Sequence, residues 1–138
     1  MHAGLVSITF RKLTPDSIID LARKGGILGI EWGGDIHVPH GDLVTAEHVG
    51  RTTRAAGLTT PTYGSYYKVG CSEHEGLGFT TVLDTALALG APAIRVWAGN
   101  KGSADAEEHH WDHLIKDLQR ICGLAHSQGI QIFLEYHA

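Results

Sequence analysis

The chain has 138 residues, of which 43% are hydrophobic and 19% charged, enough for one domain with a buried core and too apolar for a disordered chain. Lys and Arg number 11 against 15 Asp and Glu, so the net charge is −4 and no basic excess exists to bind nucleic acid. No apolar run approaches the ~20 residues that cross a bilayer. Two cysteines, Cys71 and Cys122, cannot form a disulfide framework, and without a signal peptide we expect reduced thiols in the cytoplasm.

Short β-like runs alternate with helical stretches along the whole chain. The first helix is predicted to begin at Thr14, a capping residue followed by Pro15, and to end at Gly25. The second covers residues 43–56, with a weaker apolar stripe. The strands are predicted at residues 5–10, 27–32, 58–63, 93–97 and 130–136. The strand at 58–63 is the least regular, because Pro61 cannot donate a hydrogen bond to a neighbouring strand.

Two further helices are predicted in the second half of the chain. Residues 72–75 match a capping box, which places the start of the third helix there and its end at Gly90. Ser103 or Asp105 is expected to cap the fourth helix. Its apolar stripe is the clearest in the sequence, and it assigns Cys122 to the core. That stripe consists of Trp111, Leu114, Ile115, Leu118, Ile121, Cys122 and Ala125.

The order β-α-β-α-β-α-β-α-β indicates parallel strands joined by right-handed helical crossovers. Two architectures fit this order: an open doubly wound sheet of five strands, and part of an eight-stranded βα barrel. No glycine-rich phosphate loop follows the first strand, and no fifth helix follows the last one. We therefore expect an α/β fold that is a partial (βα)8 TIM barrel of about four and a half βα units, with residues 1–138 as a single domain.

Ligands of parallel βα folds meet the carboxyl ends of the strands, where the loops converge. Polar and aromatic side chains follow every predicted strand at this rim, an arrangement that suits binding of sugar rings and hydroxyls. They are Thr9, Phe10, Arg11, Glu31, Trp32, Asp35, His37, His40, Tyr63, Ser65, Tyr66, Tyr67, Arg95, Trp97, Asn100, Lys101, Glu135 and His137.

Glu135 interrupts an apolar strand, where a carboxylate is costly unless it is paired or binds a cation. Its two interpretations are metal or acid–base chemistry, and a structural ion pair with Arg95 on the adjacent strand. Glu31 has the same setting, and its interpretations are structural pairing, substrate contact and metal binding. His37 and His40 either face the rim together or are solvated loop residues. His109 and His113, four apart on the fourth helix, are assigned to a solvated face, and Tyr63, Tyr66 and Tyr67 could pack the rim.

Five segments in order resemble the sugar phosphate isomerase/epimerase group of the xylose isomerase-like barrel superfamily. They are SITFR at 7–11, GIEWGGDIHVPHGD at 29–42, YGSYY at 63–67, IRVWAG at 94–99 and LEYH at 134–137. The resemblance implies a barrel with a divalent cation (Mn, Mg or Co) at the carboxyl ends of the strands. It places Glu135 at the first metal ligand, with a further role as catalytic base.

The resemblance also implies a mechanism of proton transfer through an enediolate. We predict that the sugar or sugar phosphate is bound by Glu31, Trp32, His37, Tyr63 and Trp97. Because one carboxylate does not make a metal site, this chain alone is not expected to be a competent isomerase. The unpaired edges of the first and last strands predict self-association, and no nucleic acid or membrane partner is expected.

Three alternatives stay open. An inosose dehydratase-like lyase belongs to the same superfamily, whereas an apurinic-site endonuclease of that superfamily is disfavoured by the acidic net charge. A non-catalytic half-barrel is the second alternative, and a five-stranded receiver-like domain with its first strand in the centre of the sheet is the third.

Overall fold

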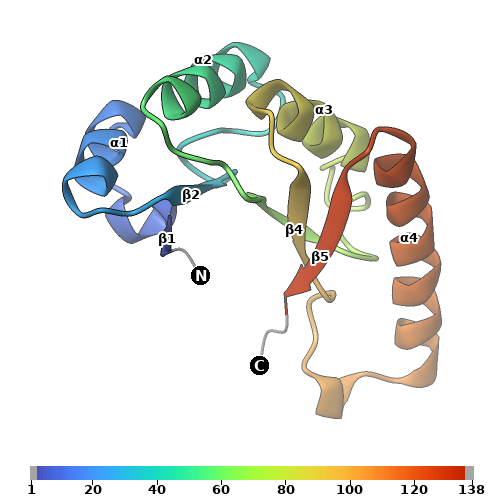
Figure 1. Ribbon diagram of the computed structural model, residues 1–138. Helices are drawn as coiled ribbons and strands as arrows, with labels where there is room; N and C mark the ends of the chain where they lie inside the picture. Colours follow the sequence, from blue (N-terminus) through green and yellow to red (C-terminus); the bar gives the residue numbers. More distant parts are fainter. Residues whose placement is uncertain (1–2, 136–138) are drawn as a thin grey trace.

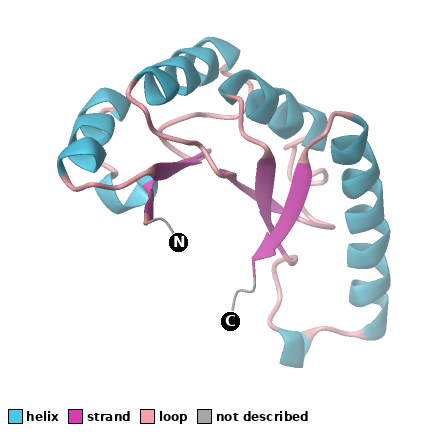
Figure 2. Ribbon diagram, in the orientation of Figure 1, coloured by secondary structure: helices cyan, strands magenta, loops and turns pink. Residues whose placement is uncertain are grey.

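The computed structural model describes residues 3–135, which form a curved parallel sheet with its helices on the convex side (Figures 1 and 2). The sheet has the order β1-β2-β3-β4-β5, so each strand pairs with the next one along the chain. This order confirms the partial barrel and excludes the receiver-like domain, in which the first strand would be central. The strands are β1 (Gly4–Val6), β2 (Gly29–Gly33), β3 (Tyr63–Lys68), β4 (Ala93–Trp97) and β5 (Gln131–Glu135).

Four α-helices cover the sheet, and local sequence signals set several of their ends. Thr14 Oγ1 accepts a hydrogen bond from the Ser17 amide at 3.3 Å, as its capping role predicts. Gly90, with φ of 76°, ends the third helix in the left-handed conformation. The helices are α1 (Pro15–Lys24), α2 (Leu43–Ala55), α3 (Phe79–Leu89) and α4 (Glu108–Ser127), with 3₁₀ turns η1 (Ser7–Phe10) and η2 (Ser103–Asp105).

The core lies between the sheet and the helices. Alternate residues of each central strand point toward the helices, and burial of each large side chain there contributes about 1.5–3 kcal/mol. The helices also pack closely on one another, because Gly50 of α2 faces α3: an added Cβ would lie 2.1 Å from the Leu89 carbonyl oxygen. Fully buried side chains include Ile18, Ile30, Val49, Val82, Leu89, Ile94, Val96, Ile121 and Ala125.

Two strands have other bounds in the structure than the sequence predicts. The run at 5–10 is a strand only as far as Val6, since the chain then turns into η1 and directs Ser7 into the core. The strand predicted at 58–63 begins at Tyr63 and continues to Lys68. Before it, Thr59 forms only an isolated bridge with Gly29, which is consistent with the missing amide proton of Pro61.

Two predicted helix starts were also wrong. Helix α3 begins at Phe79 rather than near residue 72, and Glu73 caps it from a distance by accepting a hydrogen bond from the Phe79 amide at 3.0 Å. Helix α4 begins at Glu108, because Ser103 and Asp105 belong to the separate turn η2.

Only part of the apolar stripe of α4 packs against the sheet. Leu114, Ile121 and Ala125 are buried, whereas Trp111 and Ile115 are 39% and 49% exposed. The Cys122 side chain lies at the surface, so its assignment to the core was wrong. Among residues 3–135, no helix is long and apolar enough to span a membrane.

Candidate functional site

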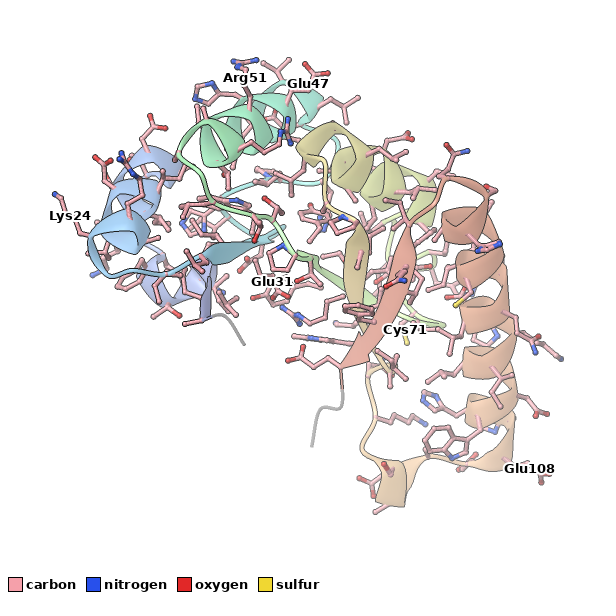
Figure 3. All side chains as sticks on the ribbon, viewed as in Figure 1. Lys24, Glu31, Glu47, Arg51, Cys71 and Glu108 are labelled. Carbon is pink, nitrogen blue, oxygen red and sulfur yellow. The ribbon has the colours of Figure 1, made fainter. Side chains whose placement is uncertain are left out.

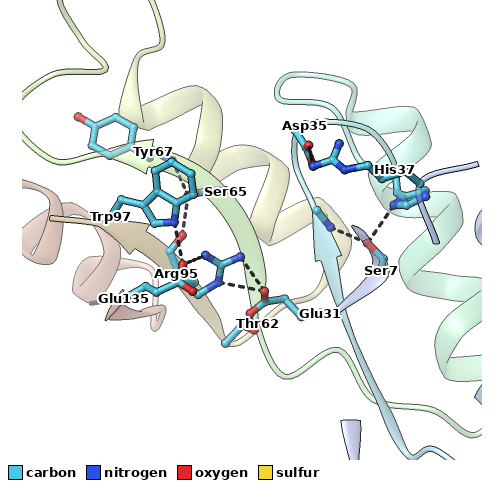
Figure 4. A network of polar contacts seen from close by, with 12 residues as sticks. Ser7, Glu31, Asp35, His37, Thr62, Ser65, Tyr67, Arg95, Trp97 and Glu135 are labelled. Atoms are coloured by element: carbon cyan, nitrogen blue, oxygen red, sulfur yellow. Dashed lines mark hydrogen bonds and ion pairs between the residues drawn. The ribbon is translucent and has the colours of Figure 1, made fainter. Parts of the chain in front are cut away.

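An ion-pair cluster lies on the concave face of the sheet, where Glu31 points inward (Figures 3 and 4). The Arg95 guanidinium donates to Oε1 of Glu31 through Nε and Nη2, both at 2.9 Å. Its Nη1 contacts Oε2 of Glu135 on the neighbouring strand, and Thr62 donates to the second oxygen of Glu31. One cation therefore joins carboxylates from β2 and β5, two strands that are not adjacent in the sheet.

The cluster keeps Arg95 charged. Burial opposes the charged form of this guanidinium, but its hydrogen bond to Glu31 and the charges of Glu31 and Glu135 outweigh that cost and raise the pKa of Arg95. The Arg95 and Glu31 side chains are only 15% and 12% exposed, so solvent screens their attraction weakly.

Gly64 makes the contact across β3 possible. It pairs in register with Arg95, and an added Cβ at Gly64 would lie 2.9 Å from Nη2 of Arg95 and 3.0 Å from Oε1 of Glu31. Any side chain at this position would occupy the space where the ion pair now forms. The absence of a side chain at Gly64 thus lets β2 and β4 meet on the concave face.

Trp97 and Glu135 are register partners on β4 and β5. The Trp97 indole Nε1 donates to Oε2 of Glu135 at 2.7 Å, the same oxygen that Arg95 contacts. Within the described residues, Oε1 of Glu135 accepts no hydrogen bond, and the side chain is 38% exposed. One oxygen of the partly exposed carboxylate is thus held by two donors.

Tyr66 lies beside this cluster in a strained conformation. Its φ of 57° is the only positive φ of a non-glycine residue in the described chain, at a register irregularity of β3. Its ring meets Trp97 edge-on at 5.1 Å and lies 5.6 Å from Cζ of Arg95. Burial raises the pKa of the Tyr66 phenol, and its hydroxyl is buried without a partner among residues 3–135.

A second cluster surrounds His37 (Figure 4). Nδ1 of His37 lies 2.9 Å from Oγ of Ser7, which also accepts a hydrogen bond from the Gly33 amide at 2.9 Å. His37 is 5% exposed, burial lowers the pKa of its imidazole, and Nε2 has no hydrogen-bond partner in the described part of the chain. Nearby, Arg11 and Asp35 form an ion pair at 2.6 Å.

His40 does not share a contact with His37. Its Nε2 lies 2.6 Å from the Ser65 carbonyl oxygen, and burial lowers the pKa of its imidazole. Both histidines are thus built into the loop after β2, and the solvated interpretation of this pair was wrong. His109, by contrast, is 74% exposed beside Glu107, as expected for a solvated face.

The structure brings Glu31, Trp97 and Glu135 together, as the rim argument predicts. Trp32 and Tyr63 lie elsewhere, fully buried between the sheet and the helices. Trp32 Nε1 donates to Thr53 Oγ1 of α2 at 3.2 Å, and the Tyr63 hydroxyl donates to the Val38 carbonyl at 2.8 Å. Direct substrate contact by either ring would require the core to open.

The described residues do not by themselves complete a metal site. No group of three or more His, Cys, Asp or Glu side chains within 3–135 is arranged to hold a metal ion. Glu135 offers one unengaged oxygen, and Glu31 is committed to Arg95 and Thr62. A stable divalent site needs several oxygen or nitrogen ligands.

Sequence reasoning treated Arg95 as a structural partner and passed over Tyr66 as rim packing. The signal that could have singled out Arg95 is a cation inside an apolar strand, in a chain with carboxylates inside two other predicted strands, Glu31 and Glu135. No sequence signal marks the strained backbone of Tyr66, because tyrosine is common in strands and rare at positive φ.

Comparison with solved structures supports the fold. AsbF from Bacillus anthracis, a probable 3-DHS dehydratase involved in petrobactin synthesis, is 24% identical with a TM-score of 0.82, covering 99% of this chain and 53% of that one. A xylose isomerase domain protein from Planctomyces limnophilus is 15% identical with a TM-score of 0.71, covering 97% and 53%. The IolI protein with a bound zinc atom is 12% identical with a TM-score of 0.75, covering 97% and 51%. Among the curated proteins none matches.

The chain spans about half the length of these solved structures. The family model for the xylose isomerase-like TIM barrel matches residues 19–138, which is most of the sequence and includes the strands that carry Glu31, Arg95 and Glu135. The chain therefore belongs to the xylose isomerase-like TIM barrel family.

Proposed function

We propose that this chain forms the substrate-binding part of a sugar or sugar-phosphate isomerase or epimerase. The observation that carries the proposal is the carboxylate of Glu135 on the concave face of the sheet, held through Oε2 by Arg95 and Trp97 and without a hydrogen bond to Oε1 from residues 3–135. A fixed carboxylate with one accessible oxygen is suited to act as a general base.

In the proposed reaction, Oε1 of Glu135 removes the proton from the carbon next to a carbonyl of an open-chain sugar. The C–H electron pair forms the carbon–carbon double bond of an enediolate, and the carbonyl electrons move to oxygen. Return of the proton to the former carbonyl carbon, with transfer of the adjacent hydroxyl proton to the former carbonyl oxygen, isomerises the sugar. Delivery of a proton by a second acid to the opposite face of the original carbon epimerises it. Arg95 and Trp97 keep the carboxylate oriented through both transfers.

The other predicted residues have supporting roles in this proposal. Trp97 and Tyr66 present aromatic surface to the C–H face of the sugar, an interaction common in carbohydrate binding. Glu31 orients Arg95 from the opposite side. His37 would contact a sugar hydroxyl through Nε2, the nitrogen without a partner among the described residues. That contact requires the substrate to extend to the loop after β2.

A divalent cation (Mn, Mg or Co) is part of the proposal as an electrophile that would polarise the sugar carbonyl. The zinc atom bound by the IolI protein supports a cation here. Glu135 is the side chain that would contribute a ligand from this chain, and a cation held at Oε1 would replace its role as base. Since residues 3–135 offer no further ligand group around it, we assign no step of the reaction to the cation.

A dehydratase is the second candidate, favoured by the similarity to AsbF. An inosose dehydratase-like lyase would use the same first step, removal of a proton next to a carbonyl, and would then expel a hydroxyl from the adjacent carbon. The third possibility is a half-barrel that binds sugars without catalysis. The cytoplasmic location expected from the unpaired cysteines stays a prediction.

The test is a titration of the chain with MnCl₂, followed by the electron paramagnetic resonance signal of free Mn²⁺. We expect the wild type to bind Mn²⁺ weakly and Glu135→Gln to lose that binding. Glu75→Gln is the matched control, since Glu75 is 51% exposed in the loop after β3. Equal binding by all three proteins would contradict the proposal and favour the non-catalytic half-barrel. We expect no turnover by residues 1–138 alone, because one carboxylate does not complete a metal site.

A further inference from the structure

A small pocket opens at the carboxyl end of β4, next to the Glu135 cluster. Its volume is about 250 Å³, less than the ~300 Å³ at which pockets begin to enclose whole small-molecule ligands. It therefore suits one end of a ligand. The lining residues are Lys68, Trp97, Ala98, Gly99, Asn100, Lys101 and Gly102.

The pocket is positively charged although the chain is acidic. Lys68 and Lys101 are the two charged residues of its lining, and no carboxylate belongs to it. Net charge over the whole sequence is −4, so general basicity does not explain this pair of lysines. A site with this charge selects a negatively charged group.

Both ammonium groups are available to a ligand. Lys68 Nζ lies 3.6 Å from Glu75 Oε2, a long contact between two partly exposed side chains that stabilises the fold little. Lys101 forms no ion pair with any residue in the described range. The Asn100 side chain adds an amide that can donate to oxygen atoms. Gly99, with φ of 77°, lets the backbone turn tightly around this space.

Trp97 is shared by the pocket and the Glu135 cluster. It lines the pocket, while its indole nitrogen donates to Glu135. Lys68 on β3 is the register partner of Trp97 on β4, so the two residues lie side by side in the sheet. A ligand with its charged end between the lysines would reach the open oxygen of Glu135 by passing over a single indole ring.

A larger pocket of about 510 Å³ is less selective. It lies between the loop after β3 and α4, and His74, His113 and Lys116 line it. Its carboxylates, Glu73 and Asp117, are paired with Arg120 within the same wall, so positive and negative groups are mixed there. The pocket after β4 is the smaller one, but its charge has a single sign.

We propose that the Lys68–Lys101 pocket binds the anionic group, phosphoryl or carboxylate, of a carbohydrate whose carbon chain extends over Trp97 toward Glu135. This inference rests on the proposed function for the direction of the carbon chain, and it names the substrate class as anionic. Two lysines act here as point charges, so either anion can be held, and the binding free energy decreases as ionic strength rises.

The experiment follows amide shifts of the ¹⁵N-labelled chain by NMR during titration with glucose 6-phosphate, gluconate or glucose. We expect the two anions to shift the 98–102 amides and glucose to bind more weakly. Lys101→Met and Lys68→Met should each weaken anion binding about fivefold, as for loss of one charge ~4 Å away in water. Lys24→Met is the control, because Lys24 lies on the outer face of α1 (Figure 3). Tighter binding of glucose 6-phosphate than gluconate identifies a phosphoryl group, and the reverse a carboxylate.

The outcomes separate this inference from the proposed function. Equal anion affinity in the wild type and both lysine variants, with native circular dichroism, would overturn the pocket even if Mn²⁺ binding depends on Glu135. Conversely, anion binding that is weakened in the lysine variants supports the anion site, even if Glu135→Gln binds Mn²⁺ as tightly as the wild type. Glucose binding as tightly as both anions would also overturn it.

Discussion

Arg95 and Glu31 meet across an intervening strand: their 2.9 Å ion pair passes over Gly64 of β3. Charged groups on β2 and β4 normally lie two strand spacings apart, about 9–10 Å in the sheet. The long guanidinium side chain and the missing Cβ of Gly64 remove that separation. The contact thereby links the early strands of the sheet to the later ones and orients Glu135.

Arg95→Met should destabilise the fold by about 3 kcal/mol, because it leaves the mostly buried carboxylate of Glu31 unpaired. Urea unfolding measures this change. The matched control is Arg11→Met, which breaks an ion pair whose arginine is 51% exposed and should cost less than about 1 kcal/mol. Equal losses in the two variants would show that the buried cluster has no special role in stability.

Burial of His37 and His40 should make the fold sensitive to acid. Burial lowers the pKa of both imidazoles below their unfolded value of about 6.5. The unfolded chain therefore takes up protons first as pH falls, so stability is greatest above pH ~6.5 and decreases below it. Urea unfolding between pH 7.5 and 5 measures the slope, which should be smaller in His37→Gln. A flat profile in the wild type would contradict the prediction.

Tyr66→Phe should leave stability unchanged or raise it, since the hydroxyl that it removes is buried without a partner in the described chain. Tyr63→Phe is the matched change and should cost about 1 kcal/mol, because the Tyr63 hydroxyl donates to the Val38 carbonyl. Thermal unfolding of both variants provides the comparison. A larger loss for Tyr66→Phe than for Tyr63→Phe would mean that the Tyr66 hydroxyl has a partner in solution.

Gly50→Ala should destabilise the protein by about 2–4 kcal/mol, because the new methyl group would overlap the Leu89 carbonyl of the adjacent helix. Gly123→Ala on α4 is the opposite case. Nothing lies within 4 Å of a Cβ at Gly123, and alanine should stabilise that helix by about 1 kcal/mol. Denaturant midpoints of the two variants should therefore move in opposite directions, and a shift in the same direction would argue against the close approach of α2 and α3.

The open edge of β5 should promote self-association, as we propose from its exposed apolar side chains. Phe133 and Leu134 are 48% and 49% exposed on this edge strand. Sedimentation velocity should detect dimers or larger species that become rarer in Phe133→Lys, because a charge on an edge strand disfavours pairing. Val44→Lys, on the exposed face of α2, is the control. A monomer at all concentrations would refute the proposal.

The helix ends that were predicted correctly are those set by residues of the same turn. Thr14, Pro15 and Gly90 act through the backbone of their own turns, so the ends of α1 and α3 that they set could be read directly. The start of α3 could not, because Glu73 caps it from six residues upstream. The displaced start of β3 agrees with the missing amide proton of Pro61, whereas the irregular backbone at Tyr66 inside that strand has no signal in the sequence.

The site was predictable in part for the same reason. A carboxylate ending an apolar strand is visible in the sequence, and both interpretations of Glu135, ligand or partner of Arg95, were available from it. The structure contains the ion pair, and the second oxygen accepts no hydrogen bond from residues 3–135. The contact between Glu31 and Arg95 depends on strand register and on Gly64. Neither can be read from the residues that flank Glu31 and Arg95 in the sequence.

The strand order β1-β2-β3-β4-β5 has a consequence for assembly of the molecule. Every strand pairs with the one before it, so a nascent chain can add one βα unit after another, with each new unit closing only a short loop. The described strands therefore need no pairing between distant parts of the chain, which favours rapid folding.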